Sequence, residues 1–132
     1  MGDFRKLEVW QRARLLSLRI YQITRQFPSA ERYGLTAQMR GASVAILSNL
    51  AEGSGWNGSR DLSRFLTTAQ GSAAELECQT LLARDLGYST NDEAGELLAE
   101  VATIRQMLTR RAQRVKLARK AAARRPRSAK GW

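Results

Sequence analysis

Apolar residues recur alternately four and three positions apart in four successive segments of this chain, and this spacing constrains its fold more than any other feature. In the first segment the series is Val9, Ala13, Leu16, Ile20, Ile23 and Phe27. Such spacing places the side chains on one side of an α-helix, whereas the strict alternation typical of β-strands occurs nowhere in the sequence. A chain of 132 residues, 43% of them apolar, can close one core. The sequence therefore predicts a single all-α domain.

Glycine, proline and capping residues divide this pattern into four predicted helices, at 7–26, 36–52, 60–86 and 92–116. Pro28 follows the first, Gly53 suits the left-handed residue after the second, and Thr90 to Glu93 form a capping box before the fourth. Gly71 lies inside the third and predicts a close backbone approach there. Four helices joined by short loops favour an up-down-up-down antiparallel four-helix bundle over residues 1–117, followed by a basic C-terminal extension at 118–132 that is flexible unless bound.

Cysteine content and hydropathy predict a cytoplasmic protein that does not enter a membrane. The single cysteine, Cys78, rules out an intramolecular disulfide and fits a reducing compartment. The charged first residues lead into no apolar segment of a secretory signal, and no apolar run approaches the ~20 residues that cross a bilayer.

Positive charge is concentrated at the C-terminal end. Residues 1–109 contain 12 Lys and Arg and 12 Asp and Glu, so the net charge of +10 belongs entirely to residues 110–132. The basic residues of this segment are Arg110, Arg111, Arg114, Lys116, Arg119, Lys120, Arg124, Arg125, Arg127 and Lys130. They predict contacts with phosphates of RNA or DNA that carry little sequence preference. A solubilising tail and another acidic partner are the alternatives, while a membrane surface is disfavoured because the segment lacks a bulky apolar face.

A second candidate set for nucleic-acid contacts lies on the first predicted helix. It comprises Arg12, Arg14, Arg19 and Arg25, which occupy faces other than the apolar one.

Polar residues beside the apolar face of the second and third helices predict a structural layer. If the two helices are antiparallel, a buried polar layer forms between them and fixes their register. Its predicted members are Arg40, Asn49, Glu52, Arg64 and Glu75. The alternative is a carboxylate metal site at Glu52, Glu75 and Glu77, which is disfavoured because di-iron bundles also use histidine and this chain has none. No catalytic residue, metal or cofactor is expected.

Several apolar residues fall outside the predicted core faces and predict an interface between copies of the chain. They include Leu15, Leu18, Leu47, Phe65, Leu81 and Leu82. The alternative is that the core faces are wider than the spacing suggests.

Short motifs in order along the chain resemble those of a known family. They are Leu7-Glu-Val-Trp10, Phe27-Pro28, Glu31-Arg-Tyr-Gly-Leu35, Gln38-Met-Arg40, Ser48-Asn-Leu-Ala-Glu-Gly53, Phe65-Leu66, Gly71-Ser72 and Glu75-Leu-Glu77. These motifs resemble the four-helix-bundle proteins encoded in 23S rRNA intervening sequences, which look related to the accessory variability proteins of diversity-generating retroelements. Those accessory proteins form pentameric barrels and bind nucleic acid and a reverse transcriptase.

The resemblance implies an up-down-up-down bundle, a homopentamer and no enzymatic activity. It makes RNA or DNA and a reverse transcriptase candidate partners, with ribosomal RNA or a retroelement transcript as the nucleic acid. Gly41 departs from the family, which tends to carry a second arginine after Arg40. A structural scaffold that binds a protein partner remains the alternative function.

Overall fold

A computed structural model of the protein describes residues 3–55 and 59–124, and every regular element in these ranges is helical. The four α-helices are α1 (Glu8–Thr24), α2 (Leu35–Ser54), α3 (Ser59–Asp85) and α4 (Asn91–Arg124). Two short 3₁₀ turns, η1 (Phe4–Lys6) and η2 (Ser29–Glu31), precede α1 and α2. The prediction of an all-α fold is confirmed.

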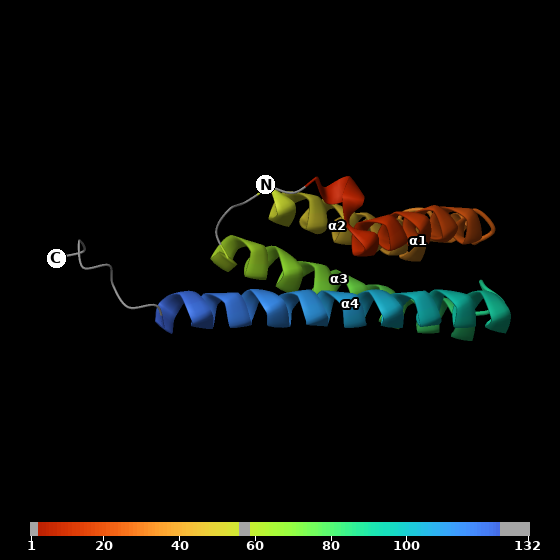
Figure 1. Ribbon diagram of the computed structural model, residues 1–132. Helices are drawn as coiled ribbons and strands as arrows, with labels where there is room; N and C mark the ends of the chain where they lie inside the picture. Colours follow the sequence, from red (N-terminus) through yellow and green to blue (C-terminus); the bar gives the residue numbers. More distant parts are fainter. Residues whose placement is uncertain (1–2, 56–58, 125–132) are drawn as a thin grey trace.

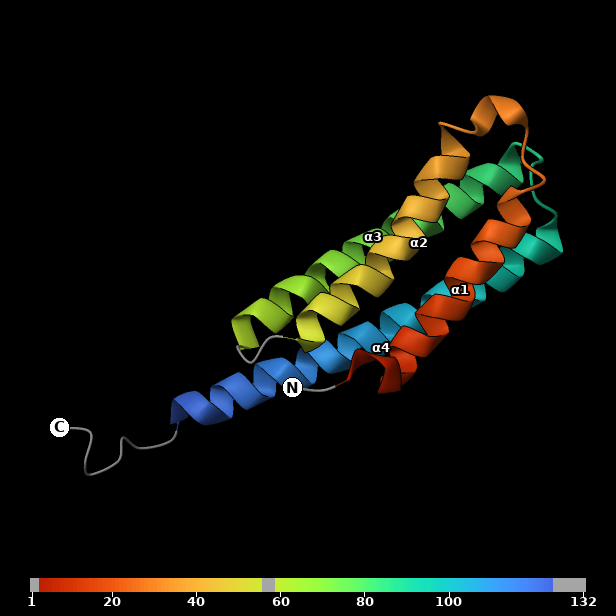
Figure 2. The same ribbon diagram turned by 90° about the horizontal axis from the view of Figure 1, so that it is seen from above.

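The helices form an antiparallel four-helix bundle in which each helix packs on its neighbours in the sequence (Figures 1 and 2). The fourth helix closes the bundle by packing on α1 as well as on α3. Within the described ranges, the diagonal pairs α1 with α3 and α2 with α4 have no two Cα atoms within 8 Å of each other. This is the predicted up-down-up-down arrangement.

The predicted apolar series forms the core almost without change. All six residues of the first series are buried, and so are Leu35, Met39, Ala42, Ile46 and Leu50 of α2. The buried residues of α4 are Ala94, Leu97, Val101, Ile104 and Leu108. In α3 the residues Leu66, Ala69, Ala73, Leu76 and Ala83 are buried, and Leu62 is half-buried at the margin of the core. Burial of one continuous apolar face per helix supplies the main driving force for this fold.

The end of α2 differs from the prediction at Gly53. This glycine lies inside the helix, which continues to Ser54, and it is not in the left-handed region. A Cβ at this position would lie 3.1 Å from Cβ of Phe65 and 3.2 Å from Cδ1 of Leu62. Glycine is therefore needed here because α3 passes close to the α2 backbone, and not because the chain turns.

The close approach predicted at Gly71 is wrong. Gly71 is exposed, and a Cβ there would meet no atom within 4 Å. The glycine that does need its left-handed freedom is Gly87, with φ of 77°. The amides of Gly87 and Tyr88 donate to the carbonyls of Arg84 and Ala83 at 2.9 Å, which is the hydrogen-bond pattern of a Schellman motif that ends α3.

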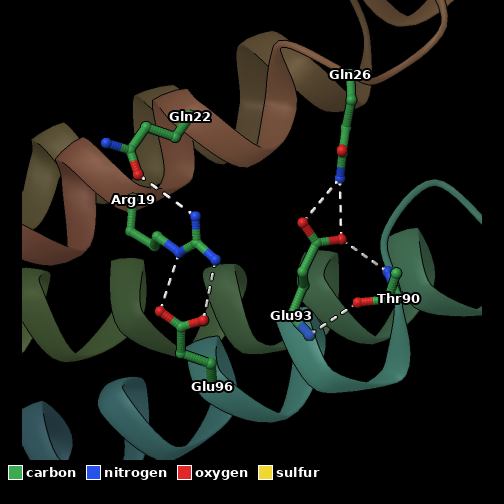
Figure 3. Close-up of polar contacts among 6 residues, drawn as sticks. All are labelled: Arg19, Gln22, Gln26, Thr90, Glu93 and Glu96. Atoms are coloured by element: carbon green, nitrogen blue, oxygen red, sulfur yellow. Dashed lines mark hydrogen bonds and ion pairs between the residues drawn. The ribbon is translucent and has the colours of Figure 1, made fainter.

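The start of α4 carries the predicted capping box (Figure 3). The Glu93 amide donates to Oγ1 of Thr90 at 3.0 Å, and the Thr90 amide donates to Oε1 of Glu93 at 2.9 Å. The bond from the Thr90 amide, and after it the bonds that Nε2 of Gln26 donates to the same carboxylate, lower the pKa of Glu93.

The far end of α4 extends beyond the predicted boundary at 116. The helix continues to Arg124, so residues 118–124 of the predicted tail are helical. Residues 116–124 are all exposed, which means that roughly 14 Å of helix projects past the bundle (Figures 1 and 2). We call this segment the α4 overhang. No helix in the described part of the chain is both long and apolar enough to cross a membrane.

Candidate nucleic-acid interface

Two arginines of the second candidate set join α1 to α4. Arg12 donates from Nε and Nη2 to the two carboxylate oxygens of Glu100, both at 2.9 Å. Arg19 makes the same bidentate pair with Glu96, at 2.9 and 3.1 Å, and is held by Gln22 as well (Figure 3). These hydrogen bonds raise the pKa of both arginines, and the glutamates neutralise their charge. Neither guanidinium is therefore presented to an external phosphate.

The other two arginines of that set, Arg14 on α1 and Arg25 directly after this helix, are exposed. Neither has an ion-pair partner among the residues that the structure describes. Arg14 borders a shallow hollow that also involves Trp10 and Leu15. The second set is thus divided, with two members used in the bundle and two left on its surface.

The basic residues of α4 are in a different situation from Arg12 and Arg19. Seven of them lie in the described part of the helix, and no carboxylate is within ion-pair distance of any of the seven there. They are Arg110, Arg111, Arg114, Lys116, Arg119, Lys120 and Arg124. All are exposed except Arg111, which is half-buried. The remaining predicted residues, Arg125, Arg127 and Lys130, lie outside the described residues.

Three of these arginines gather where α4 passes the first turn of α1. Arg110, Arg111 and Arg114 border a hollow of about 290 Å³. Its other lining residues are Glu8, Val9 and Met107. Burial lowers the pKa of Arg111, and the neighbouring charge of Arg114 lowers it further. Sequence reasoning missed Glu8, Val9 and Met107, because their proximity to the arginines depends on the packing of α1 against α4.

The predicted polar layer between α2 and α3 is wrong. Arg40 turns to α1 instead, where its Nε donates to Oγ1 of Thr24 at 2.9 Å and its guanidinium lies 4.5 Å from the ring centre of Tyr21. Asn49 donates to the carbonyl of Ala45 in its own helix at 2.8 Å.

The other members of that predicted layer face solvent. Glu52 and Glu75 are exposed, and Arg64 is exposed over the ring of Phe65, 3.8 Å from Asp61. Leu50 and Gly53 take the positions that face the core and α3, so the polar residues on either side of them are turned outward.

The buried polar groups are instead small hydroxyls. Oγ of Ser17 donates to Oγ of Ser43 at 2.9 Å between α1 and α2. Thr80 donates to the carbonyl of Leu76 at 2.7 Å within α3.

The glutamates considered for a metal site do not come together. Glu77 accepts a hydrogen bond from Arg105 of α4 at 2.9 Å. Across the described ranges, no group of three or more His, Cys, Asp or Glu could hold a metal ion.

Exposed leucines form two separate pairs on the bundle. Leu15 and Leu18 of α1 are 59% and 53% exposed, and Leu82 and Leu86, at the C-terminal end of α3 and directly after it, are 50% and 49% exposed. The other three residues predicted to lie outside the core, Leu47, Phe65 and Leu81, are half-buried, and Leu47 packs against the core. The half-buried residues therefore fit a core that is wider than the spacing suggests, whereas the interface between copies stays a prediction for the exposed leucines.

Comparisons with known proteins agree with the fold. Residues 5–110 match the family described as 23S rRNA-intervening sequence protein. The fold is similar to the crystal structure of a protein of unknown function from the S23 ribosomal protein family of Bacteroides thetaiotaomicron VPI-5482. That comparison has a TM-score of 0.68 and 18% identity, and it covers 76% of this chain and 94% of that one. No curated protein matches the sequence.

Proposed function

This chain belongs to the family of 23S rRNA-intervening sequence proteins, and we propose that it is a non-enzymatic accessory protein that binds RNA or DNA mainly through phosphate contacts. The proposal places these contacts on the basic residues of α4 and of the segment that follows it. The family match ends at Arg110, so the charge argument for this segment is independent of the family assignment.

The observation that carries the proposal is the difference in pairing between the arginines of α1 and those of α4. Arg12 and Arg19 each meet a glutamate at 2.9 Å, whereas the seven basic residues from Arg110 to Arg124 have no such partner among the described residues. Unpaired cations on an exposed helix attract a polyanion and release its counterions on binding. A helix that projects from the bundle can present this charge without clashing with the body.

Truncation after Thr109 tests this function. The truncated protein should lose most of its affinity for RNA and DNA but keep its fold, because the deleted part contributes only the half-buried Arg111, Ala112 and Val115 to the packing. If about six phosphates are engaged, affinity of the full chain should fall about a thousandfold between 50 and 200 mM salt. Equal affinity and equal salt dependence in the two proteins would contradict the assignment to α4 and move attention to Arg14 and Arg25.

We further propose that the chain assembles as a homopentamer. The two leucine pairs lie on α1 and α3, which sit on diagonally opposite sides of the bundle. Two different apolar surfaces suit a head-to-tail interface, which closes into a ring when the rotation between subunits allows it. Five copies would bring five basic helices to one assembly, and this avidity would multiply a weak contact. Light scattering should give five times the chain mass of 14.8 kDa, and a monomer at micromolar concentration would reject this.

The family resemblance extends the proposal to partners. We propose ribosomal RNA or a retroelement transcript as the nucleic acid, and a reverse transcriptase encoded beside the gene as the protein partner. Co-purification of the two proteins that survives nuclease treatment would support a direct contact. Loss of the reverse transcriptase after nuclease treatment would mean that nucleic acid alone joins them.

The exposed leucines also favour a second candidate function, an oligomeric scaffold that binds a protein partner while the basic segment only solubilises it. A scaffold of this kind would show no salt-dependent affinity for RNA or DNA. The salt titration above therefore separates the two functions.

A further inference from the structure

We propose that the hollow between the first turn of α1 and α4 is a seat for one phosphate group of a nucleic-acid strand, held by Arg110, Arg111 and Arg114. This phosphate seat rests on the nucleic-acid binding proposed above. It adds a fixed anchoring point in the folded body to the diffuse contacts of the α4 overhang.

The shape and lining of the hollow suit a phosphate group. Val9 is buried and Met107 is half-buried, so they supply the apolar part of the lining, while the three arginines and Glu8 supply the polar part. The volume of about 290 Å³ accommodates a phosphate with neighbouring sugar atoms. Arginine suits this role because its planar guanidinium can donate two parallel hydrogen bonds to phosphate oxygens.

The charge in the hollow is unbalanced. Three arginines and one glutamate leave two positive charges, and Glu8 is not within ion-pair distance of any of the three. Arg105, one turn earlier on α4, does have a glutamate at 2.9 Å. The bundle thus pairs Arg105 and leaves the three arginines of the hollow without an ion-pair partner among the described residues.

Two further observations indicate why an anion would bind favourably in the hollow. Arg111 is half-buried with Arg114 nearby, and both effects disfavour its charged form, as the lowered pKa records. A bound phosphate would offset both. In addition, α1 begins at Glu8 after Leu7, which supplies no side-chain cap, so the positive end of the helix dipole lies beside the hollow.

Three single substitutions in the full chain test the phosphate seat. Arg111→Gln removes a charge inside the hollow, and Arg119→Gln removes the same charge from the exposed overhang as the matched control. Glu8→Gln removes the only negative charge of the hollow. Binding would be measured by fluorescence anisotropy with a labelled 20-nucleotide RNA of mixed sequence at one fixed salt concentration.

We expect Arg111→Gln to weaken RNA binding about tenfold and Arg119→Gln only about threefold, because a desolvated bidentate contact is stronger than an exposed one. Glu8→Gln should strengthen binding about twofold or more, which a misfolded variant cannot do. The Arg111→Gln protein should melt no lower than the wild type, since it loses a buried charge that Arg114 repels.

Inorganic phosphate distinguishes a strand from a free anion as the occupant. At constant ionic strength, phosphate in place of chloride should raise the melting temperature of the wild type and of Arg119→Gln but not that of Arg111→Gln. If phosphate shifts the melting temperatures in this way but Arg111→Gln and Arg119→Gln bind RNA with equal affinity, the hollow holds a free anion, and the proposed contact with a nucleic-acid strand is overturned.

The failures of the seat and of the proposed function can be told apart. Equal loss of RNA affinity in Arg111→Gln and Arg119→Gln, with no gain in Glu8→Gln, would overturn the seat and leave nucleic-acid binding intact. If the wild type binds neither RNA nor DNA at low salt, the proposed function is wrong. The phosphate seat is then also wrong as a contact with a nucleic-acid strand.

Discussion

The bundle and the α4 overhang use the same residue type in opposite ways. In the bundle, Arg12, Arg19 and Arg105 each hold a glutamate from a neighbouring helix, so their charge contributes to packing. In the overhang, residues 116–124 are all exposed, and within residues 3–55 and 59–124 no neighbouring helix supplies an acid. The difference teaches that the amino-acid type does not decide the role of a cation in this protein; what decides it is whether a second helix lies opposite.

This contrast predicts that substitutions in the overhang change binding and leave stability unchanged, whereas substitutions of residues that pack or pair the helices of the bundle do the reverse.

Removing the four charges of the overhang should have the largest effect. In a protein with Lys116, Arg119, Lys120 and Arg124 all changed to Gln, we expect affinity for RNA to fall about a hundredfold at 100 mM salt, with a shallower salt dependence. The melting temperature should stay unchanged because these side chains contact no other helix. A large fall in melting temperature would show that the overhang packs on something, and the contrast would then break down.

Gly53→Ala tests the bundle at its closest helix approach. The added methyl group would lie 3.1 Å from Cβ of Phe65, so we expect a loss of about 1 to 3 kcal/mol in the free energy of unfolding. RNA affinity per folded molecule should not change.

Gly71→Ala is the matched control, because a Cβ there meets no atom within 4 Å. It should stabilise the protein by about 1 kcal/mol through helix propensity alone. Chemical denaturation of both variants measures the difference, and a neutral Gly53→Ala would contradict the close approach.

The capping box gives a smaller effect that depends on pH. Thr90→Ala should lower the free energy of unfolding by about 1 kcal/mol, since it removes the hydroxyl that accepts a hydrogen bond from the Glu93 amide. The pKa of Glu93 is lower in the folded protein than in the unfolded chain. Ionised Glu93 therefore contributes its full share of folding stability above the pKa of the unfolded chain, and this share is lost as the pH falls through the pKa of the folded protein. Melting temperatures between pH 6 and pH 3 should therefore fall less in Glu93→Gln than in the wild type. An identical fall would show that Glu93 does not contribute.

The smallest expected effect is the loss of the surface ion pairs between α1 and α4. Arg12→Gln and Arg19→Gln should lower the melting temperature only slightly, and high salt should remove the difference from the wild type. Neither variant should weaken RNA binding, in contrast to the four-residue change in the overhang. If either variant bound RNA as poorly as the protein with four overhang substitutions, the arginines of α1 would belong to the nucleic-acid interface.

The sequence alone determined the bundle, because the apolar spacing, the capping box and the loop residues are local signals. Val9, Ile20, Ile46 and Leu108 could be assigned to the core since helical geometry fixes which positions share a face. The concentration of positive charge beyond Thr109 was equally plain, because counting residues requires no structure.

Only the tertiary structure decided which polar side chains meet. The angle at which α2 packs on α3 turned Glu52 outward and brought Gly53 against Phe65, so a polar layer that the spacing allowed did not form. The packing of α4 on α1 paired Arg12 with Glu100 and placed Glu8 beside Arg111, although more than 80 residues separate each pair. The physical reason is that helical periodicity fixes the direction of a side chain within its own helix, whereas the rotation and register of one helix against another depend on the whole core.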